Sequence, residues 1–334
     1  MRKWFLFFGA IIIFSLSIKA AEIFRLPTAN RAIFDPARQA EFFVGTTGKP
    51  WPSGTFGCVR GGGWQMHEGL DIRATQRDKR GEPLDPILAT AHGTVVYFNA
   101  RPSLSNYGNY IILRHFVDGL EIYSVYGHLR EIREGLKIGQ LVKAGEIIGL
   151  MGRTSNTQER ISKERAHVHF ELNFLVSDRF SDWQKKNSPG QRNDHGIWNG
   201  QNLIGLDPQL IFLLQKKEGF NLLNFVQNQT ELCRVLVRAT DFSWLKRYRL
   251  LVRRNPVAEK HGAAGYEIAL NFNGLPFELV PRAASEIKSK GRYKLLSVNA
   301  PEYKKNPCRR LISPNGKSWV LASGGLHLLD LLTH

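Results

Sequence analysis

Short runs of β-branched and aromatic residues recur along the first half of the chain, with glycine-containing turns between them. Such runs are typical of β-strands, and glycines such as Gly93 and Gly108 are typical of turns. They cover residues 87–89, 94–97, 110–113 and 121–126. Residues 233–238 and 248–253 alternate between apolar and polar positions and predict further strands. The pattern therefore predicts a mainly β protein with an antiparallel sheet or barrel.

Changes in this pattern divide the chain. Residues 21–54 carry four prolines and little periodicity, and they predict an extended N-terminal arm. The strand-rich pattern occupies residues 55–213, interrupted at 176–205 by a polar stretch that predicts a long loop of a kind that is often functional. Residues 209–217 predict a short helix. Residues 214–334 predict a smaller, β-rich accessory domain.

The first 20 residues have the layout of a secretory signal peptide. A basic start (Arg2, Lys3) precedes an apolar run at 4–18, and Ala20 supplies a small residue for cleavage. The run is shorter than the roughly 20 residues that a membrane-spanning helix needs, although an uncleaved anchor is the alternative. We therefore expect an exported protein, located in the periplasm, the cell envelope or the extracellular space.

The formal net charge of +17 is the one unusual number in the composition. Loss of the three basic residues of the leader lowers it to +14, of which residues 22–213 carry +3 and residues 214–334 carry +11. Such an excess favours an anionic partner, and export makes nucleic acid a poor one. We expect the C-terminal region to bind an anionic envelope polymer or lipid; a merely solvated basic surface is the alternative.

Three cysteines are compatible with one disulfide in an oxidising compartment. Cys233 and Cys308 lie in the same half of the chain and are the expected pair. For Cys58, nine residues before His67, we expect a disulfide or a buried thiol and no role in metal binding.

Four histidines and one aspartate carry the candidate chemistry. His167 and His169 flank Val168, so a strand would direct both rings to one face. His67 and Asp71 are four apart around a glycine, which favours a turn entering a strand. Each motif alone is common on protein surfaces. Together, two imidazoles, one carboxylate and a position left for water form the ligand set of a catalytic zinc site, and further histidines could then move protons.

Three segments, in this order along the chain, resemble the lysostaphin-type zinc endopeptidases, the LytM-domain peptidases of the bacterial cell wall: His67-Glu68-Gly69-Leu70-Asp71, Tyr126-Gly127-His128-Leu129 and His167-Val168-His169-Phe170-Glu171-Leu172. Residues 86–96, 107–115 and 142–152 resemble the strands between these motifs. The resemblance covers about residues 60–175, together with Asp207-Pro208. It implies an antiparallel LytM-type sheet with a substrate groove.

The resemblance also implies roles for individual residues. His67, Asp71 and His169 match the ligands of one Zn²⁺ ion, and His128 and His167 match the catalytic histidines. His115 matches a structural position or one beside the ligands, and Glu171 shares the histidine face of its strand, where we expect it to support a ligand.

The insertion at 176–205 is expected to form a wall or lid of the groove. Trp183 and Trp198, which lie within it, are candidates for contact with substrate. Packing of these tryptophans against the C-terminal region is an equally weighted alternative.

The function expected from these residues is hydrolysis of peptide bonds in peptidoglycan by an exported zinc endopeptidase. The alternative from another class is a non-catalytic LytM-type module that binds and activates a cell-wall amidase. The intact set of five residues disfavours this alternative, because degenerate members of the family act in that way after losing metal ligands. Inhibition of the groove by the N-terminal arm stays open.

Overall fold

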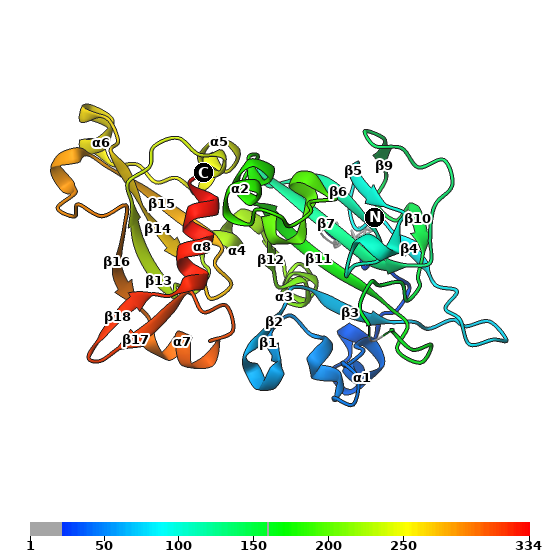
Figure 1. Ribbon diagram of the computed structural model, residues 1–334. Helices are drawn as coiled ribbons and strands as arrows, with labels where there is room; N and C mark the ends of the chain where they lie inside the picture. Colours follow the sequence, from blue (N-terminus) through cyan, green and yellow to red (C-terminus); the bar gives the residue numbers. More distant parts are fainter. Residues whose placement is uncertain (1–21, 159) are drawn as a thin grey trace, which may run out of the picture.

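The computed structural model describes residues 22–158 and 160–334, so the predicted signal peptide lies outside the described residues. Antiparallel sheets dominate both halves of the molecule, as the sequence pattern predicted (Figure 1). Within the described ranges, no helix is long and apolar enough to cross a membrane.

A seven-stranded sheet forms the centre of the N-terminal region, which we define as residues 22–213. Strand β3 (Leu70–Arg73) pairs with one end of β11 (His167–Leu175), a strand that is buried along its whole length. The remaining order across the sheet is β12 (Leu203–Leu206), β11 (His167–Leu175), β7 (Leu120–Leu129), β6 (Asn109–Val117), β5 (Gly93–Asn99) and β9 (Leu141–Val142). The sheet therefore brings the segments around residues 70, 128 and 168 side by side.

Two smaller sheets complete this region. One contains β4 (Pro86–Leu88), β10 (Ile147–Leu150) and β8 (Glu131–Ile132). The other pairs β1 (Gly57–Arg60) with β2 (Gln65–His67), with Gly57 opposite His67. The predicted strands at 87–89, 94–97, 110–113 and 121–126 therefore coincide with β4, β5, β6 and β7, within a few residues at their ends.

The predicted extended arm is wrong in part. Within residues 22–54 the chain forms the short helix α1 (Gln39–Phe42) and three 3₁₀ turns, Ala32–Phe34, Pro36–Arg38 and Trp51–Gly54. Phe24, Phe42 and Phe43 are fully buried. Prolines break periodicity here, but the aromatic residues between them bind the arm to the main core, and hydrophobic burial outweighs the local preference for extension.

The predicted loop at 176–205 also contains regular structure. Helix α2 (Phe180–Asn187) buries Phe180, Trp183 and Gln184, and two 3₁₀ turns follow at Gly196–Trp198 and Gly200–Asn202. The buried positions lie three and four residues apart, which is the spacing of one helix face. Only this face of the helix is apolar, and the polar residues around it gave the segment the overall composition of a loop.

The C-terminal region, residues 214–334, is built on a four-stranded antiparallel sheet, which confirms the prediction of a β-rich region. The sheet order is β15 (Pro276–Arg282), β14 (Gly265–Leu270), β13 (Cys233–Val237) and β16 (Tyr293–Val298), and a hairpin pairs β17 (Ile312–Asn315) with β18 (Ser318–Leu321). The helices around the connection and this sheet are α3 (Pro208–Leu214), α4 (Leu222–Gln227), α5 (Ser243–Arg247), α6 (Pro256–His261), α7 (Ala300–Lys305) and α8 (Ser323–Leu332).

The predicted strand at 248–253 is wrong. Residues Arg249–Leu251 form a 3₁₀ turn after α5 instead. Tyr248 and Leu251 are buried three residues apart, a spacing that a turn satisfies and a strand does not.

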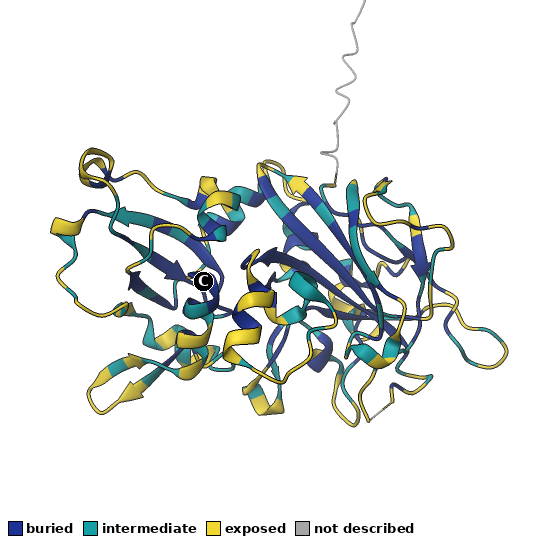
Figure 2. Cartoon of the chain, turned by 45° about the horizontal axis from the view of Figure 1, so that its top comes forward, coloured by how far each residue is buried: buried dark blue, intermediate teal, exposed yellow. Residues whose placement is uncertain are grey.

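One buried hydrophobic cluster runs through both regions, and buried segments meet along their boundary (Figure 2). Phe174 of β11 stacks on Trp244 with ring centroids 5.6 Å apart, and the backbone N–H of Leu175 donates to the Tyr248 hydroxyl at 2.9 Å. Arg247 forms ion pairs with Glu121 and Asp178 across the same boundary. The C-terminal region is therefore packed firmly onto the main sheet.

The predicted Cys233–Cys308 disulfide is wrong. Cys308 is bonded to Cys58 of β1, with a Cα–Cα distance of 5.4 Å. Cys233 is a free thiol in the core of the C-terminal sheet, where burial raises its pKa to about 12. Proximity in sequence misled the prediction, because the loop after α7 folds back onto the N-terminal region. A disulfide is compatible with an exported protein.

Candidate functional site

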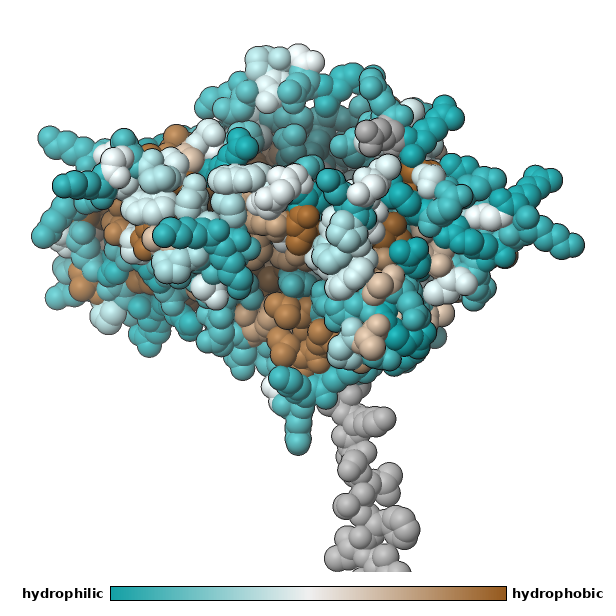
Figure 3. All heavy atoms as spheres, turned by 90° about the horizontal axis from the view of Figure 1, so that it is seen from below, coloured by the Kyte–Doolittle hydropathy of each residue, from teal (hydrophilic) through white to brown (hydrophobic). Residues whose placement is uncertain are grey.

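The candidate site lies in a cleft of about 1440 Å³ that both regions of the molecule line. Strands β2, β7 and β11 supply one side, residues 308–311 and helix α8 supply the opposite side, and the insertion at 195–204 closes part of the rim. Hydrophobic side chains gather in the middle of the lower face of the molecule, between largely hydrophilic flanks (Figure 3). The insertion thus forms a wall of the cleft, as the sequence predicted.

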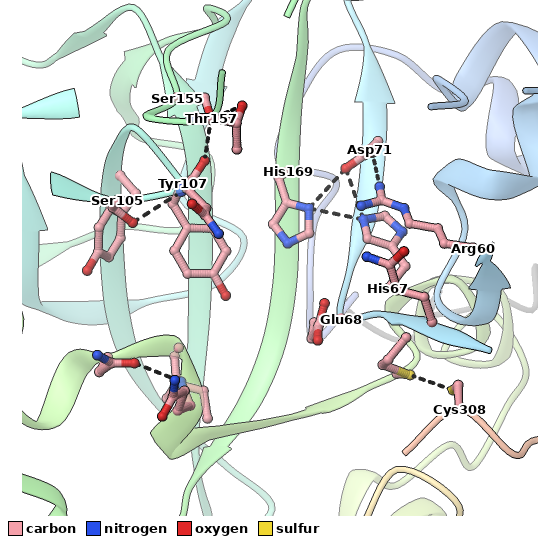
Figure 4. A pocket seen from close by; sticks show the side chains of 18 of the residues that line it. Arg60, His67, Glu68, Asp71, Ser105, Tyr107, Ser155, Thr157, His169 and Cys308 are labelled. Carbon is pink, nitrogen blue, oxygen red and sulfur yellow. Dashed lines mark hydrogen bonds and ion pairs between the residues drawn. The ribbon is translucent and has the colours of Figure 1, made fainter. Parts of the chain in front are cut away.

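His67, Asp71 and His169 converge from three different strands at the base of the cleft (Figure 4). His67 Nε2 lies 3.1 Å from Asp71 Oδ1 and 3.2 Å from His169 Nδ1, and His169 Nδ1 lies 2.9 Å from the same carboxylate oxygen. All three side chains are buried. The register explains the meeting, because His169 pairs directly with Asp71 across β11 and β3, and β2 ends at His67.

The outer nitrogen of each of these two histidines is held by a hydrogen bond. His67 Nδ1 donates to the Thr55 carbonyl at 2.7 Å, and His169 Nε2 donates to Glu171 Oε1 at 2.7 Å. Each ring therefore directs its other nitrogen at the shared point. Such outer partners are the usual means by which proteins fix the tautomer of a metal-binding histidine.

The electrostatics of the cluster favour a positive charge at that point. Burial alone lowers the pKa of His169, but hydrogen bonds and charge from Asp71 and Glu171 outweigh it and raise the pKa to about 10. The inward atoms of the three residues, two imidazole nitrogens and one carboxylate oxygen, can each offer a lone pair to the same cation. Two imidazoles and one carboxylate are a donor set that suits Zn²⁺. These residues therefore fit a bound zinc ion.

His128 and His167 stand beside this cluster, with ring centroids 4.9 Å apart. His128 Nδ1 donates to the Thr154 carbonyl at 2.8 Å, and His167 Nδ1 donates to the Arg165 carbonyl at 2.6 Å. His128 thus keeps Nε2 available to accept a proton, whereas His167 Nε2 lies 3.4 Å from Asp71 Oδ1. Burial, followed by neighbouring His167 and His169, holds the pKa of His128 well below its ordinary value, so this ring is neutral and able to act as a base.

His128 also has an unusual backbone, with a φ of 62° in the left-handed region. Few residues with a side chain adopt that conformation, and it occurs often at functional sites. Its N–H donates to the Tyr107 carbonyl at 2.7 Å, which holds the strained turn. The backbone therefore turns the imidazole toward the cleft.

Glu171 lies where the sequence placed it, next to a ligand candidate. Besides His169, its carboxylate accepts hydrogen bonds from the Tyr107 hydroxyl at 2.7 Å and from Asn173 Nδ2 at 2.7 Å. His115 lies elsewhere: its ring nitrogens bond the His92 carbonyl at 2.8 Å and Ser124 Oγ at 2.7 Å. His115 therefore contacts none of the ligand candidates and matches the structural alternative.

The structure places neither tryptophan of the insertion among the residues that line the cleft. Trp183 is buried, stacks edge-on with His327, and donates from Nε1 to Asp330 Oδ2 of α8 at 2.9 Å. Trp198 packs on Tyr123 with centroids 5.5 Å apart. Trp183 therefore matches the second alternative, packing against the C-terminal region, and not contact with substrate.

Several residues in the cleft were not found from the sequence. Arg60 binds Asp71 Oδ2 at 2.6 Å and so holds the second oxygen of the ligand carboxylate. His195 bonds the Tyr97 hydroxyl and the Leu104 carbonyl at the cleft rim. Arg309 reaches the cleft from the C-terminal region. None of these residues stands in a motif, so only the three-dimensional arrangement brings them to the site.

Comparison with known families supports the expected resemblance. Residues 65–181 match the family described as Peptidase family M23. The matched segment contains all five metal-ligand and catalytic candidates, and the resemblance to the LytM and lysostaphin-type peptidases is thereby confirmed for that segment. Among curated protein sequences none matches the chain.

Solved structures of this kind also match, over limited parts of the chain. A zinc-containing peptidase from Vibrio cholerae is 31% identical over 32% of this chain and 26% of its own, with a TM-score of 0.24. The catalytic domain of lysostaphin from Staphylococcus simulans is 28% identical over 36% of this chain and 74% of its own, with a TM-score of 0.25. A putative glycyl-glycine endopeptidase LytM from Ruminococcus gnavus is 22% identical over 46% of this chain and 47% of its own, with a TM-score of 0.29. The chain thus spans about a quarter of the Vibrio cholerae peptidase.

Proposed function

We propose that this chain, whose residues 65–181 match Peptidase family M23, is an exported zinc-dependent endopeptidase that hydrolyses peptide bonds in bacterial peptidoglycan. The observation that carries the proposal is the convergence of His67, Asp71 and His169, each held in position by a partner outside the cluster. Two further histidines lie beside the cluster, and a backbone carbonyl holds each of them through Nδ1. A site built only for structure has no need of such a pair.

His67, Asp71 and His169 would hold one Zn²⁺ ion. When bound, zinc polarises a substrate carbonyl and lowers the pKa of water to about 7. The protein contributes a fixed arrangement around it. Arg60, Glu171 and the Thr55 carbonyl hold the outer atoms of Asp71, His169 and His67, so that the three ligand atoms are directed inward before any ion arrives.

His128 and His167 would carry the proton. One accepts it from the attacking water at Nε2, and the resulting imidazolium can give it to the leaving amine or stabilise the oxyanion of the tetrahedral intermediate. The hydrogen bonds from Nδ1 to the Thr154 and Arg165 carbonyls keep each ring oriented throughout. Burial, which keeps His128 neutral, supports the role of base for that residue.

The C-terminal region carries most of the excess positive charge, +11 of the +14 expected after export. We propose that it also holds the enzyme near an anionic envelope polymer or lipid. The arrangement of five intact residues favours an enzyme over a non-catalytic activator of an amidase.

The direct test uses purified protein spanning residues 22–334. Loaded with zinc, it should release soluble fragments from intact peptidoglycan, and mass spectrometry of the fragments identifies the bond. Chelation should abolish release and zinc should restore it. Zinc-loaded protein that cleaves nothing, but stimulates a purified amidase, would establish the activator function instead.

A further inference from the structure

The C-terminal wall of the cleft presents two consecutive arginines, Arg309 and Arg310. They follow Cys308 directly, and Figure 4 shows that cysteine on the His67 side of the pocket, across from Tyr107. The proposed hydrolysis uses neither arginine. They are the only charged residues that the C-terminal region contributes to the described lining of the cleft.

Two connections fix this arginine pair relative to the ligand cluster. The disulfide joins Cys308 to Cys58, whose neighbour Gly57 is paired with His67. Asn273 provides the second connection: its Oδ1 accepts from Arg309 Nε at 2.7 Å, while its Nδ2 donates to the Gly205 carbonyl of β12 at 2.8 Å. Fixed donors lose little conformational freedom on binding, which favours recognition of a ligand.

Arg309 lies beside a carboxylate but is not saturated by it. Its Nη1 is 3.6 Å from Oε1 of Glu68, the residue that follows His67. This distance is too long for a direct hydrogen bond. Both side chains are partly exposed, at 29% and 38%. A carboxylate group is therefore accommodated next to Arg309, one residue from a metal-ligand candidate.

Arg310 lies in a tight turn, and no ion pair with a described residue occupies its side chain. Its φ of 49° lies in the left-handed region, and its N–H donates to the Pro307 carbonyl at 3.1 Å to close a tight turn. Helix α8 packs on this turn so closely that a Cβ on Gly324 would lie 2.4 Å from the Arg309 carbonyl oxygen. Among the described residues the Arg310 side chain has no recorded ion pair or hydrogen bond, and it is exposed.

The remaining charges of the cleft leave these two arginines available. Among the described residues that line the cleft, four are arginines and two carry a carboxylate. Arg60 is paired with Asp71 at 2.6 Å, and Arg165 binds the Gly45 carbonyl and Thr47 Oγ1. Glu68, the remaining carboxylate of the described lining, lies near Arg309, so the two consecutive arginines carry two positive charges beside a single carboxylate.

We propose that Arg309 and Arg310 form a carboxylate-binding subsite, which selects peptides with a free carboxylate within a few residues of the scissile bond. The proposal rests on the proposed peptidase function. Guanidinium groups match the shape of a carboxylate and bind it with paired hydrogen bonds. The carboxylate could come from the C-terminus of the peptide or from an acidic side chain. The C-terminal region would thereby determine specificity as well as location.

The test compares three forms of one synthetic peptidoglycan stem peptide: with all its carboxylates free, with only the C-terminal carboxylate amidated, and with all carboxylates amidated. For the zinc-loaded protein, we expect kcat/KM to be about ten- to a hundredfold higher for the free form than for the fully amidated form, the range typical of a charge-assisted hydrogen bond. The intermediate form shows which carboxylate is recognised.

The variants R310Q and R309Q/R310Q should lose this preference, because the rate for the free form should fall much more than the rate for the fully amidated form. R249Q is the matched control, because Arg249 is an exposed arginine of the same region outside the cleft lining. An equal rate for all three peptides in the unmodified protein would overturn the subsite. So would a preference that survives in the double variant, or a loss that affects all three peptides alike.

A binding measurement separates failure of the subsite from failure of the proposed function. Isothermal titration of the same peptides into zinc-loaded H128A protein measures recognition without cleavage. If the unmodified protein cleaves no peptide, the peptidase proposal fails, yet tighter binding of the free form that is lost in R309Q/R310Q still supports the subsite. Equal affinity for all three forms excludes it.

Discussion

The two regions of this molecule contribute different things to one cleft. The N-terminal region supplies a cluster whose charges are matched internally, since Arg60 and Glu171 each hold a ligand candidate from behind. The C-terminal region supplies two arginines beside a single carboxylate, Glu68, so their charge is only partly matched. Internal matching is what a preformed reaction centre requires. An unmatched charge is what recognition of an anionic substrate requires.

The comparison also shows how differently the two regions are held. The ligand candidates are fixed by strand register within one sheet. The arginine pair is fixed by a disulfide, by Asn273, and by the packing of α8. Changes in the first region should therefore abolish chemistry, whereas changes in the second should alter stability and selection. The following predictions test that division, from the largest expected effect to the smallest.

Substitution of His128 should have the largest effect. In H128A the proton acceptor is lost, and general acid–base catalysis typically contributes 10²–10⁴-fold. We expect cleavage of peptidoglycan to fall by about 10³-fold, with the bound zinc retained. Fragment release followed by mass spectrometry, together with metal analysis, measures both.

H261A is the control for that substitution, because His261 is an exposed histidine at the end of α6 in the C-terminal region. It should retain both cleavage and zinc. Equal activity of H128A and H261A would assign the catalytic proton transfer to another residue.

Removal of the disulfide should destabilise the fold but spare the ligand cluster. The bond spans 250 residues of sequence, and cross-links of long loops stabilise proteins by several kcal/mol. We expect the double variant C58S/C308S to lose about 3–5 kcal/mol in the free energy of unfolding, measured in urea, with its zinc content unchanged.

C233A serves as the comparison, since it removes a buried thiol and leaves the disulfide intact. It should cost less, about 1–2 kcal/mol, as expected for a small cavity. A double variant as stable as the unmodified protein would show that the noncovalent contacts between the two regions suffice to hold them together.

Asp207 should give a pH-dependent effect of intermediate size. It caps α3 through hydrogen bonds from the Gln209 and Leu210 N–H groups, and burial raises its pKa to about 6 from 3.8. Because the folded state holds this proton more tightly than the unfolded state, the stabilisation is complete below pH 4 and disappears as the pH rises through 6. Asn at this position cannot ionise.

We therefore expect D207N to gain stability relative to the unmodified protein as the pH rises from 4 to 7, by about 2 kcal/mol. Urea unfolding across that pH range measures the difference. D35N is the control, because Asp35 caps a turn through the Ala37 N–H at an exposed position. A difference between D207N and the unmodified protein that does not change with pH would mean that Asp207 is ionised like an exposed carboxyl group.

Trp183 should give the smallest effect. W183F removes the hydrogen bond from Nε1 to Asp330 but keeps most of the buried ring, which should cost about 1 kcal/mol in stability. The KM for a peptide should not change, since Trp183 lies outside the cleft lining. W198F, which changes a ring that packs on Tyr123, is the companion variant. A rise in KM for W183F would return this residue to the substrate groove.

The sequence predicted the strands and motifs of the candidate site far better than the segments around it. The strands around residues 87–126 and the motifs at His67, His128 and His169 were readable because strand alternation and ligand spacing are local properties. The helix at Phe180 and the burial of Phe24 and Phe43 were missed, because their apolar positions are sparse among polar residues and prolines.

The contribution of the C-terminal region was not readable at all. Arg309 and Arg310 stand in no motif, and the partner of Cys308 is 250 residues away. Tertiary contacts at that separation leave no local pattern in a single sequence. The excess charge of residues 214–334 pointed to an anionic partner, but only the fold shows that part of this charge faces the cleft.

The measurement that tests the account most directly is the zinc content of three proteins prepared in parallel: the unmodified chain, H169A and H128A. If His67, Asp71 and His169 hold the metal and His128 moves the proton, the unmodified protein and H128A should each contain about one zinc per chain, and H169A should contain almost none. A full complement of zinc in H169A, or none in the unmodified protein, would contradict the proposed metal centre.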